Sequence, residues 1–122
     1  MTIDLNADLG EGFGAWDLTD DAALLSVVTS ANVACGFHAG DPVRLREVLG
    51  LAAERGTAVG AQVSYRDLVG FGRRFLDASY DELLGDVLYQ VGALQGLCAG
   101  LDVKVSYVKP HGARYHACST HP

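Results

Sequence analysis

Four short apolar segments, each followed by a loop rich in charged and polar residues, alternate with helical patterns along this chain. We expect strands over residues 2–6, 30–35, 57–63 and 103–109. We expect helices over about 19–29, from Asp41-Pro42 to Gly56, and from Ser79 to Gly100. Strands in such β/α alternations run parallel, and enzymes with this architecture build their sites from the loops at the carboxyl ends. The pattern therefore predicts an α/β fold, a partial β/α barrel with about four parallel βα units.

Four strands are too few to close a small barrel, which needs about eight. The chain has 122 residues, enough for a single domain over 1–122 that corresponds to the N-terminal half of a barrel. The first and fourth strands would expose unpaired edges. Further sequence, a second copy of the chain in a homo-oligomer, or another subunit would have to cover them. After Gly112 the sequence resembles a helix start that does not continue as a helix.

Composition and charge exclude several classes of protein. Hydrophobic residues make up 49% of the chain, which argues against disorder. The net charge of −6 argues against nucleic acid or an anionic membrane as a partner. No apolar run approaches the roughly 20 residues of a transmembrane helix, and no signal peptide is visible. We therefore expect a cytoplasmic protein.

The third predicted helix carries an apolar stripe that should face the core. The stripe consists of Leu84, Val87, Leu88, Val91 and Cys98. Truncating Leu88 to alanine is accordingly expected to open a core cavity that costs roughly 2–5 kcal/mol. The long connection before this helix, about 64–78, is rich in glycine and arginine, and long ordered loops are commonly functional.

The loops after the strands contain candidate catalytic groups. Asp8 and Glu11 follow the first strand and could orient and deprotonate a water molecule. His38 and His111 follow the second and fourth strands, have glycines close by in the sequence, and could transfer protons. Lys109 supplies positive charge for an oxyanion or a phosphate.

Other residues of these loops are candidates for binding substrate or phosphate. They are Asn6, Gln62, Arg73 and Arg74. An arginine fork suits a carboxylate or phosphate, and we expect one of the two arginines to face the site and the other to face solvent.

Several neighbouring residues have simpler structural interpretations. Asp41 is better explained as a helix cap, and Tyr107 as a packing residue. Arg66 and Asp67 are expected to be solvated or to form a local pair. Cys35 fits a small buried residue better than a catalytic thiol.

A divalent metal is a further possibility, with Asp8, His38 and His111 as the ligands, since imidazole and carboxylate suit zinc and similar ions. The sequence has no H-E-x-x-H motif, and it has no G-x-x-x-x-G-K-[ST] motif for binding ATP. Any ATP would have to be held by another loop architecture or by a partner protein.

These motifs resemble those of a known family. The matching segments include Lys109-Pro110-His111-Gly112 and lie within residues 4–11, 29–42, 70–74, 89–95 and 108–113. They resemble the LamB/YcsF family over essentially residues 2–115. The resemblance implies a seven-stranded TIM-like barrel similar to metal-dependent polysaccharide deacetylases. It also implies ATP-dependent opening of 5-oxo-L-proline to L-glutamate, with ATP and Mg as cofactors and separate 5-oxoprolinase B and C subunits as partners.

The sequence departs from the family pattern at two places. Gln62 stands where many members have histidine, and the tail from Arg114 to Pro122 replaces the usual apolar continuation. Two other functions therefore remain open. One is a metal-dependent amidase or deacetylase acting on carbohydrate, and the other is an inactive, truncated barrel fragment.

Overall fold

The computed structural model describes residues 1–121, in which four parallel strands alternate with four helices. The strands are β1 (Asn6–Leu9), β2 (Ser30–Ala34), β3 (Ala58–Val63) and β4 (Val105–Pro110). The helices are α1 (Asp21–Leu25), α2 (Pro42–Arg55), α3 (Tyr80–Leu97) and α4 (Gly112–Thr120). The strands lie in the order β1-β2-β3-β4, each parallel to the next, so the predicted partial α/β barrel is confirmed.

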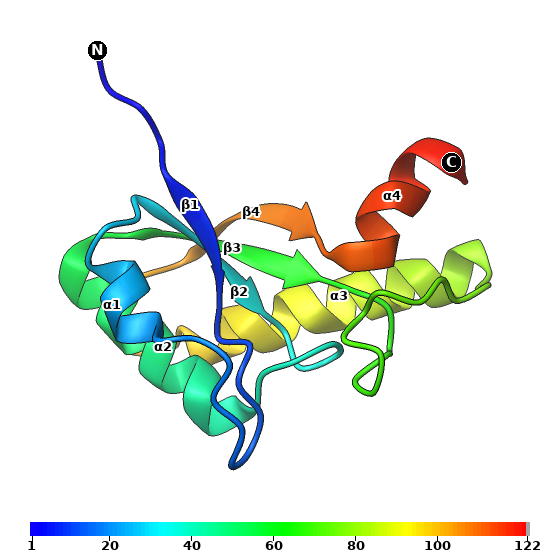
Figure 1. Ribbon diagram of the computed structural model, residues 1–122, viewed down its shortest axis with the longest axis horizontal. Coiled ribbons are helices and arrows are strands. Elements are labelled where there is room, and N and C mark those ends of the chain that lie inside the picture. Colours follow the sequence, from blue (N-terminus) through cyan, green and yellow to red (C-terminus); the bar gives the residue numbers. More distant parts are fainter. Residues whose placement is uncertain (122) are drawn as a thin grey trace.

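The two faces of the sheet differ sharply in polarity because strand side chains alternate between them. Helices α2 and α3 lie against one face, and no helix covers the opposite face in the part of the chain shown in Figure 1. The core contains fully buried strand residues such as Leu9, Val33 and Val59, packed with Leu49 of α2 and Leu94 of α3.

The uncovered face carries polar side chains at matched positions of neighbouring strands. Asp8 pairs in register with Asn32, Asn32 with Gly60, and Gln62 with Lys109. Tyr107 lies across Gly60, where any β-carbon would come within 2.0 Å of the Tyr107 ring. Glycine at position 60 therefore makes room for the tyrosine, in agreement with the predicted packing role of Tyr107.

The starts of two helices follow the predicted chemistry. Asp41 accepts hydrogen bonds from the backbone N–H groups of Val43 and Arg44, which confirms it as the cap of α2. Gly56 ends this helix with a φ of 66°, a left-handed conformation that favours glycine. Ser79 and Glu82 form the predicted capping box of α3.

Two predicted boundaries are wrong, and one helix was not predicted. The first strand, expected over 2–6, begins at Asn6, because its partner β2 starts at Ser30 and the preceding Ile3 is 87% exposed. The helix expected over 19–29 is limited to Asp21–Leu25 and is capped by Asp20. Residues 112–120 form α4, although the sequence predicts no helix there. Pro122, the last residue of the divergent tail, lies outside the described residues.

The predicted stripe of α3 is wrong at two positions. Leu84 and Leu88 are 44% and 63% exposed, so neither fills the core. The helix instead buries Asp86, Gln90 and Leu94. Gln90 is buried because its amide donates to the Ser64 carbonyl and accepts from the Ser64 N–H, two backbone groups at the end of β3. None of the helices within residues 1–121 has the length and apolar character needed to span a bilayer.

The loop between β3 and α3 is held by a buried carboxylate. Asp67 is 3% exposed and accepts from the Gly70 N–H at 2.9 Å and from the Arg74 guanidinium. The hydrogen bonds from Arg74 hold the pKa of Asp67 at about 2. Arg66 pairs instead with Asp86 of α3. Arg66 is exposed, as expected of a solvated residue, whereas the expectation is wrong for the solvation of Asp67, because Asp67 is buried and pairs with Arg74.

Candidate active site

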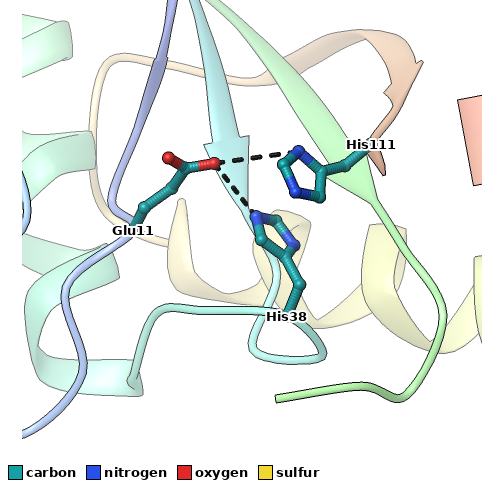
Figure 2. Close-up of side chains that lie close together, drawn as sticks. All are labelled: Glu11, His38 and His111. Carbon is teal, nitrogen blue, oxygen red and sulfur yellow. Dashed lines mark hydrogen bonds and ion pairs between the residues drawn. The ribbon is translucent and has the colours of Figure 1, made fainter. Parts of the chain in front are cut away.

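Three buried side chains from three loops meet at the carboxyl ends of the strands (Figure 2). Glu11 follows β1, His38 follows β2, and His111 lies between β4 and α4. Glu11 Oε1 is 3.1 Å from His38 Nε2 and 3.8 Å from His111 Nδ1. The two imidazole rings stack, with centroids 3.8 Å apart. We call these three residues the mouth cluster.

In each histidine, the ring nitrogen that faces away from Glu11 has a hydrogen-bond partner. This partner determines which nitrogen carries the proton. The Ser64 hydroxyl donates to the Tyr65 carbonyl at 3.0 Å, so its oxygen accepts the proton of His38 Nδ1 at 3.2 Å. His111 Nε2 donates to the Phe71 carbonyl at 3.0 Å. In their neutral forms, both histidines therefore direct an unprotonated nitrogen toward Glu11.

This arrangement brings the lone pairs of His38 Nε2 and His111 Nδ1 close to the Glu11 carboxylate. A positive charge between these groups would stabilise them. Burial, with His38 alongside, lowers the pKa of His111 and favours its neutral form. The Gln62 amide N–H donates to His111 Nδ1 at 2.9 Å, while Gln62 Oε1 is buried without a hydrogen-bond partner among the described residues. A carboxylate facing an imidazole nitrogen at hydrogen-bond distance is stabilised by a shared proton or by a bound cation. The mouth cluster can thus accept and deliver protons.

A second polar cluster lies on the uncovered face of the sheet. Asp8 accepts from Asn32 at 3.0 Å and from Lys109 at 3.2 Å, and the Tyr107 hydroxyl donates to Asn32 at 2.8 Å. Burial alone would raise the pKa of Asp8, but the hydrogen bond from Asn32 and the charge of Lys109 outweigh it and lower the pKa. Asp8 is therefore held as an anion. We call these four residues the strand cluster.

The β3–α3 loop packs directly on the two histidines. The Phe71 ring meets the rings of His38 and His111 edge-on, at centroid distances of 5.2 and 5.3 Å. Phe71 has a φ of 56°, uncommon for a residue with a side chain. A β-carbon on Gly112 would lie 2.4 Å from the Gly72 carbonyl oxygen, so glycine allows the loop and the start of α4 to approach closely. This contact places the Phe71 carbonyl where it orients His111.

The predicted site residues divide between these clusters and their surroundings. Glu11, and not Asp8, is the carboxylate that contacts the histidines, because the chain turns at Gly10 and carries Glu11 over the ends of the strands. Asp8 and Lys109 belong to the strand cluster, and Gln62 contacts the mouth cluster. Asn6 is exposed at the start of β1.

The two arginines have different surroundings. Arg73 lies over the Phe71 ring, 5.4 Å from its centroid, beside the mouth cluster. Arg74 is tied to Asp67 and keeps a side chain that is 63% exposed. Cys35 is buried, and this burial raises the pKa of its thiol to about 12, which does not suit a nucleophile.

Sequence reasoning missed three contributors to the site. Ser64 and Phe71 orient the histidines, and Asn32 connects Asp8 to Tyr107. Only Asn32 had a signal in the sequence, as a polar residue inside an apolar strand. The Phe71 contact uses a backbone carbonyl, which no side-chain pattern reveals.

The mouth cluster also fits the donor set of a divalent metal. One donor atom from each of Glu11, His38 and His111 lies within 4.8 Å of the other two. Ligands about 2.0–2.1 Å from a tetrahedral zinc lie roughly 3.3 Å apart, close to the two Glu11 distances. The Ser64 hydroxyl at His38 Nδ1 and the Phe71 carbonyl at His111 Nε2 are acceptors of the kind that metal-binding histidines usually have on their second nitrogen. The expected metal set contained Asp8, and the structure puts Glu11 in that position relative to the histidines.

Comparison with known proteins gives consistent relatives. The chain is 67% identical over 120 residues to the A subunit of 5-oxoprolinase from Mycobacterium avium (strain 104), covering 98% of this chain and 48% of the relative. It is 68% identical over 114 residues to the corresponding A subunit from Streptomyces coelicolor, covering 93% and 46%. The chain thus spans about half the length of the curated relatives it matches.

A solved structure agrees with these relatives. The crystal structure of the lactam utilization protein from Thermus thermophilus superposes with a TM-score of 0.92 at 48% identity, over 96% of this chain and 47% of that one. The sequence profile of the LamB/YcsF family matches residues 3–122. The chain therefore belongs to the LamB/YcsF family.

Proposed function

We propose that this chain acts in a 5-oxoprolinase as part of its A subunit, in the ATP-dependent hydrolysis of 5-oxo-L-proline to L-glutamate. The observation that carries the proposal is the buried Glu11–His38–His111 cluster, in a chain 67% identical to a protein named as the A subunit of 5-oxoprolinase. Since the chain spans about half of such relatives, the activity is proposed for the assembled enzyme. We propose B and C subunits as partners and the cytoplasm as the location.

Glu11 is proposed as the base. Opening the lactam requires water to add to the carbonyl carbon, the C–N bond to break, and the released nitrogen to gain a proton. Glu11 removes a proton from the water. Glu11 then passes this proton across the 3.1 Å contact to His38 Nε2, and His38 delivers it to the departing nitrogen. His111 stays neutral, in keeping with its lowered pKa, and positions His38 by stacking on its ring, with centroids 3.8 Å apart.

Positive side chains are proposed to hold the anionic groups of the substrate. Lys109 and Arg73 carry charges suited to the carboxylate of 5-oxoproline or to phosphate transferred from ATP-Mg. Asp8 keeps Lys109 in place through their 3.2 Å contact. Asn6 and Gln62 are proposed as weaker polar contacts, and Arg74, which bonds Asp67, as indirect support for the loop.

Where a divalent ion is bound, we propose Glu11, His38 and His111 as its ligands. Such an ion would polarise a carbonyl oxygen or lower the pKa of water. The same donor set supports a second candidate function, a metal-dependent amidase or deacetylase acting on carbohydrate. Elemental analysis detects a bound ion, and the substrate cleaved and the need for ATP separate the two functions. Chelator-sensitive, ATP-independent release of acetate from an acetylated sugar would favour the second.

The exposed strand edges are proposed as assembly surfaces. Within the described residues, β1 pairs only with β2 and β4 only with β3. A second copy of the chain or another subunit could add strands to these edges. Sedimentation of the chain alone tests self-association, and a monomer at micromolar concentration would count against the homo-oligomer.

The main proposal is tested by combining the chain with its partner subunits and measuring glutamate formed from 5-oxo-L-proline. We expect release only when ATP, Mg and the partners are all present. Glutamate release without ATP, or no release from a correctly folded complete complex, would contradict the proposal.

A further inference from the structure

An apolar pocket of about 110 Å³ opens beside the mouth cluster. Its polar lining residues are Glu11 and His38, and the rest of its wall is apolar. The apolar wall consists of Phe13, Trp16, Leu18, Ala39, Leu68 and Phe71. A pocket with this lining offers an apolar surface for a ligand and, at one end, the two groups that we propose to move protons.

One wall of this pocket, the loop over residues 12–18, is held in place by hydrogen bonds and ion pairs. Phe13 and Trp16 exchange backbone hydrogen bonds of 3.0 and 2.9 Å. The Gly14 N–H donates to Asp41 at 3.0 Å, and Arg44 donates to the Gly14 carbonyl at 2.9 Å. These bonds tie the loop to the start of α2. The wall is therefore formed before a ligand arrives, which lowers the entropic cost of binding.

The opposite wall is equally well anchored. Leu68 and Phe71 belong to the turn that Asp67 closes through the Gly70 N–H, and the Phe71 N–H donates to the Leu68 carbonyl. Leu68 is 41% exposed and Trp16 is 70% exposed, so both lie at the entrance and can contact a ligand. Their positions suit residues that limit the size of what enters.

The volume matches a small ring. An apolar cavity of about 150 Å³ holds a benzene molecule, so a cavity of about 110 Å³ suits a saturated ring of five atoms. A lactam of this size has a hydrocarbon side for the apolar wall and an amide edge for Glu11 and His38. We propose that this pocket holds the methylene side of a five-membered lactam and that Leu68 and Trp16 set the accepted ring size. The inference rests on the proposed function and adds the specificity-determining residues.

The fluorescence of Trp16 provides a direct test, because the chain has one tryptophan. The 122-residue chain is titrated with 5-oxo-L-proline and with its six-membered homologue, 6-oxopiperidine-2-carboxylate. We expect a blue shift that saturates at about tenfold lower concentration with the five-membered ring, since one methylene in a tight pocket changes preference roughly 10–200-fold. No shift with either lactam would overturn the proposal.

Two neighbouring substitutions separate pocket filling from general disturbance of the loop. Leu68→Phe narrows the entrance and is expected to weaken 5-oxo-L-proline binding at least about tenfold. Val69→Phe is the matched control, because Val69 is 92% exposed and does not line the pocket, and its affinity should equal that of the unaltered chain. Leu68→Ala should reduce the preference for the smaller ring. Unchanged affinity and preference in both Leu68 variants, with unaltered circular dichroism, would refute the role of Leu68.

A lactam-free probe distinguishes the failure of this inference from the failure of the proposed function. Cyclopentanecarboxylate has the same ring size and carboxylate but no amide. If it binds in a Leu68-dependent way while the complete complex releases no glutamate, the pocket stands and the proposed function fails. If the complex releases glutamate at a rate that does not change with the residue at position 68, the function stands and the pocket proposal fails.

Discussion

Two carboxylates only three positions apart, Asp8 and Glu11, have opposite surroundings. Asp8 lies within a strand, is contacted by an amide and an ammonium group, and has a lowered pKa. Glu11 lies in a loop, is 8% exposed, and faces the two stacked histidines. The sheet itself positions Asp8, whereas the position of Glu11 beside the histidines depends on the paths of three loops. We propose that these different environments give the same type of group two roles, a fixed charge for Asp8 and a proton acceptor for Glu11.

The largest difference between the clusters should appear when a histidine is removed. His38→Ala is expected to lower turnover of the complete complex about 10²–10⁴-fold, the usual contribution of acid–base catalysis. His111→Ala is expected to lower turnover as well, because His38 loses the ring on which it stacks. His116→Ala is the control, since His116 is exposed on α4. Glutamate release measures turnover, and circular dichroism measures folding. Unfolding of both histidine variants would point to a structural role instead.

The loops of the mouth cluster should be more sensitive to acid than the strand cluster. Asp67 has a folded-state pKa of about 2, below the unfolded value of about 3.9. Its stabilising contribution is therefore complete above pH 4 and is lost as the pH falls from about 4 toward 2. Asp67→Asn should lower stability at pH 7 and flatten the change in stability over that range, whereas exposed Asp102→Asn should do neither.

Urea unfolding at several pH values measures this effect. Asp67→Asn should also reduce turnover. Asp67 holds the loop whose Phe71 carbonyl is bonded to His111 of the mouth cluster. An unchanged acid slope in Asp67→Asn would show that the buried pair does not titrate as described.

The ion pair of the strand cluster should be weak. The side chains of Asp8 and Lys109 are 34% and 35% exposed, so solvent screens their attraction. A double-mutant cycle with Asp8→Asn and Lys109→Met is expected to give a coupling below about 1 kcal/mol that decreases with added salt. A coupling of several kilocalories per mole that is insensitive to salt would place this cluster in a buried environment like that of Glu11.

The smallest effect is expected far from both clusters, on the outer surface of α3. Leu88 is 63% exposed, so Leu88→Ala should change the free energy of unfolding by less than about 0.5 kcal/mol. Leu94→Ala, in the same helix but fully buried, should cost about 2–5 kcal/mol. Denaturant titration of both variants checks which face of α3 meets the core.

The alternation of elements could be predicted from the sequence because its signals are local. Strong caps such as Asp41 and the Ser79–Glu82 box fixed the starts of α2 and α3. The start of β1 could not be predicted, since pairing with Ser30 of β2 decides where it begins. The helix α4 has no such signal, because His111, at its cap position, makes no side-chain capping bond.

The site could be predicted as a region but not as a set of contacts. Parallel strands explain why His38 and His111 reach the same end of the sheet. The choice between Asp8 and Glu11 depends on the turn at Gly10, and the path of a loop cannot be read from a spacing of three residues. The orientation of His111 depends on the backbone of Phe71, which leaves no trace in side-chain chemistry.

The central claim is that Glu11 performs the proton transfer while Asp8 only provides a fixed charge. The most direct test compares kcat for ATP-dependent glutamate release by complexes carrying Glu11→Gln or Asp8→Asn. We predict a loss of about 10²–10⁴-fold for Glu11→Gln and of no more than about tenfold for Asp8→Asn, the scale of one hydrogen bond. Equal losses, or a larger loss for Asp8→Asn, would contradict the account.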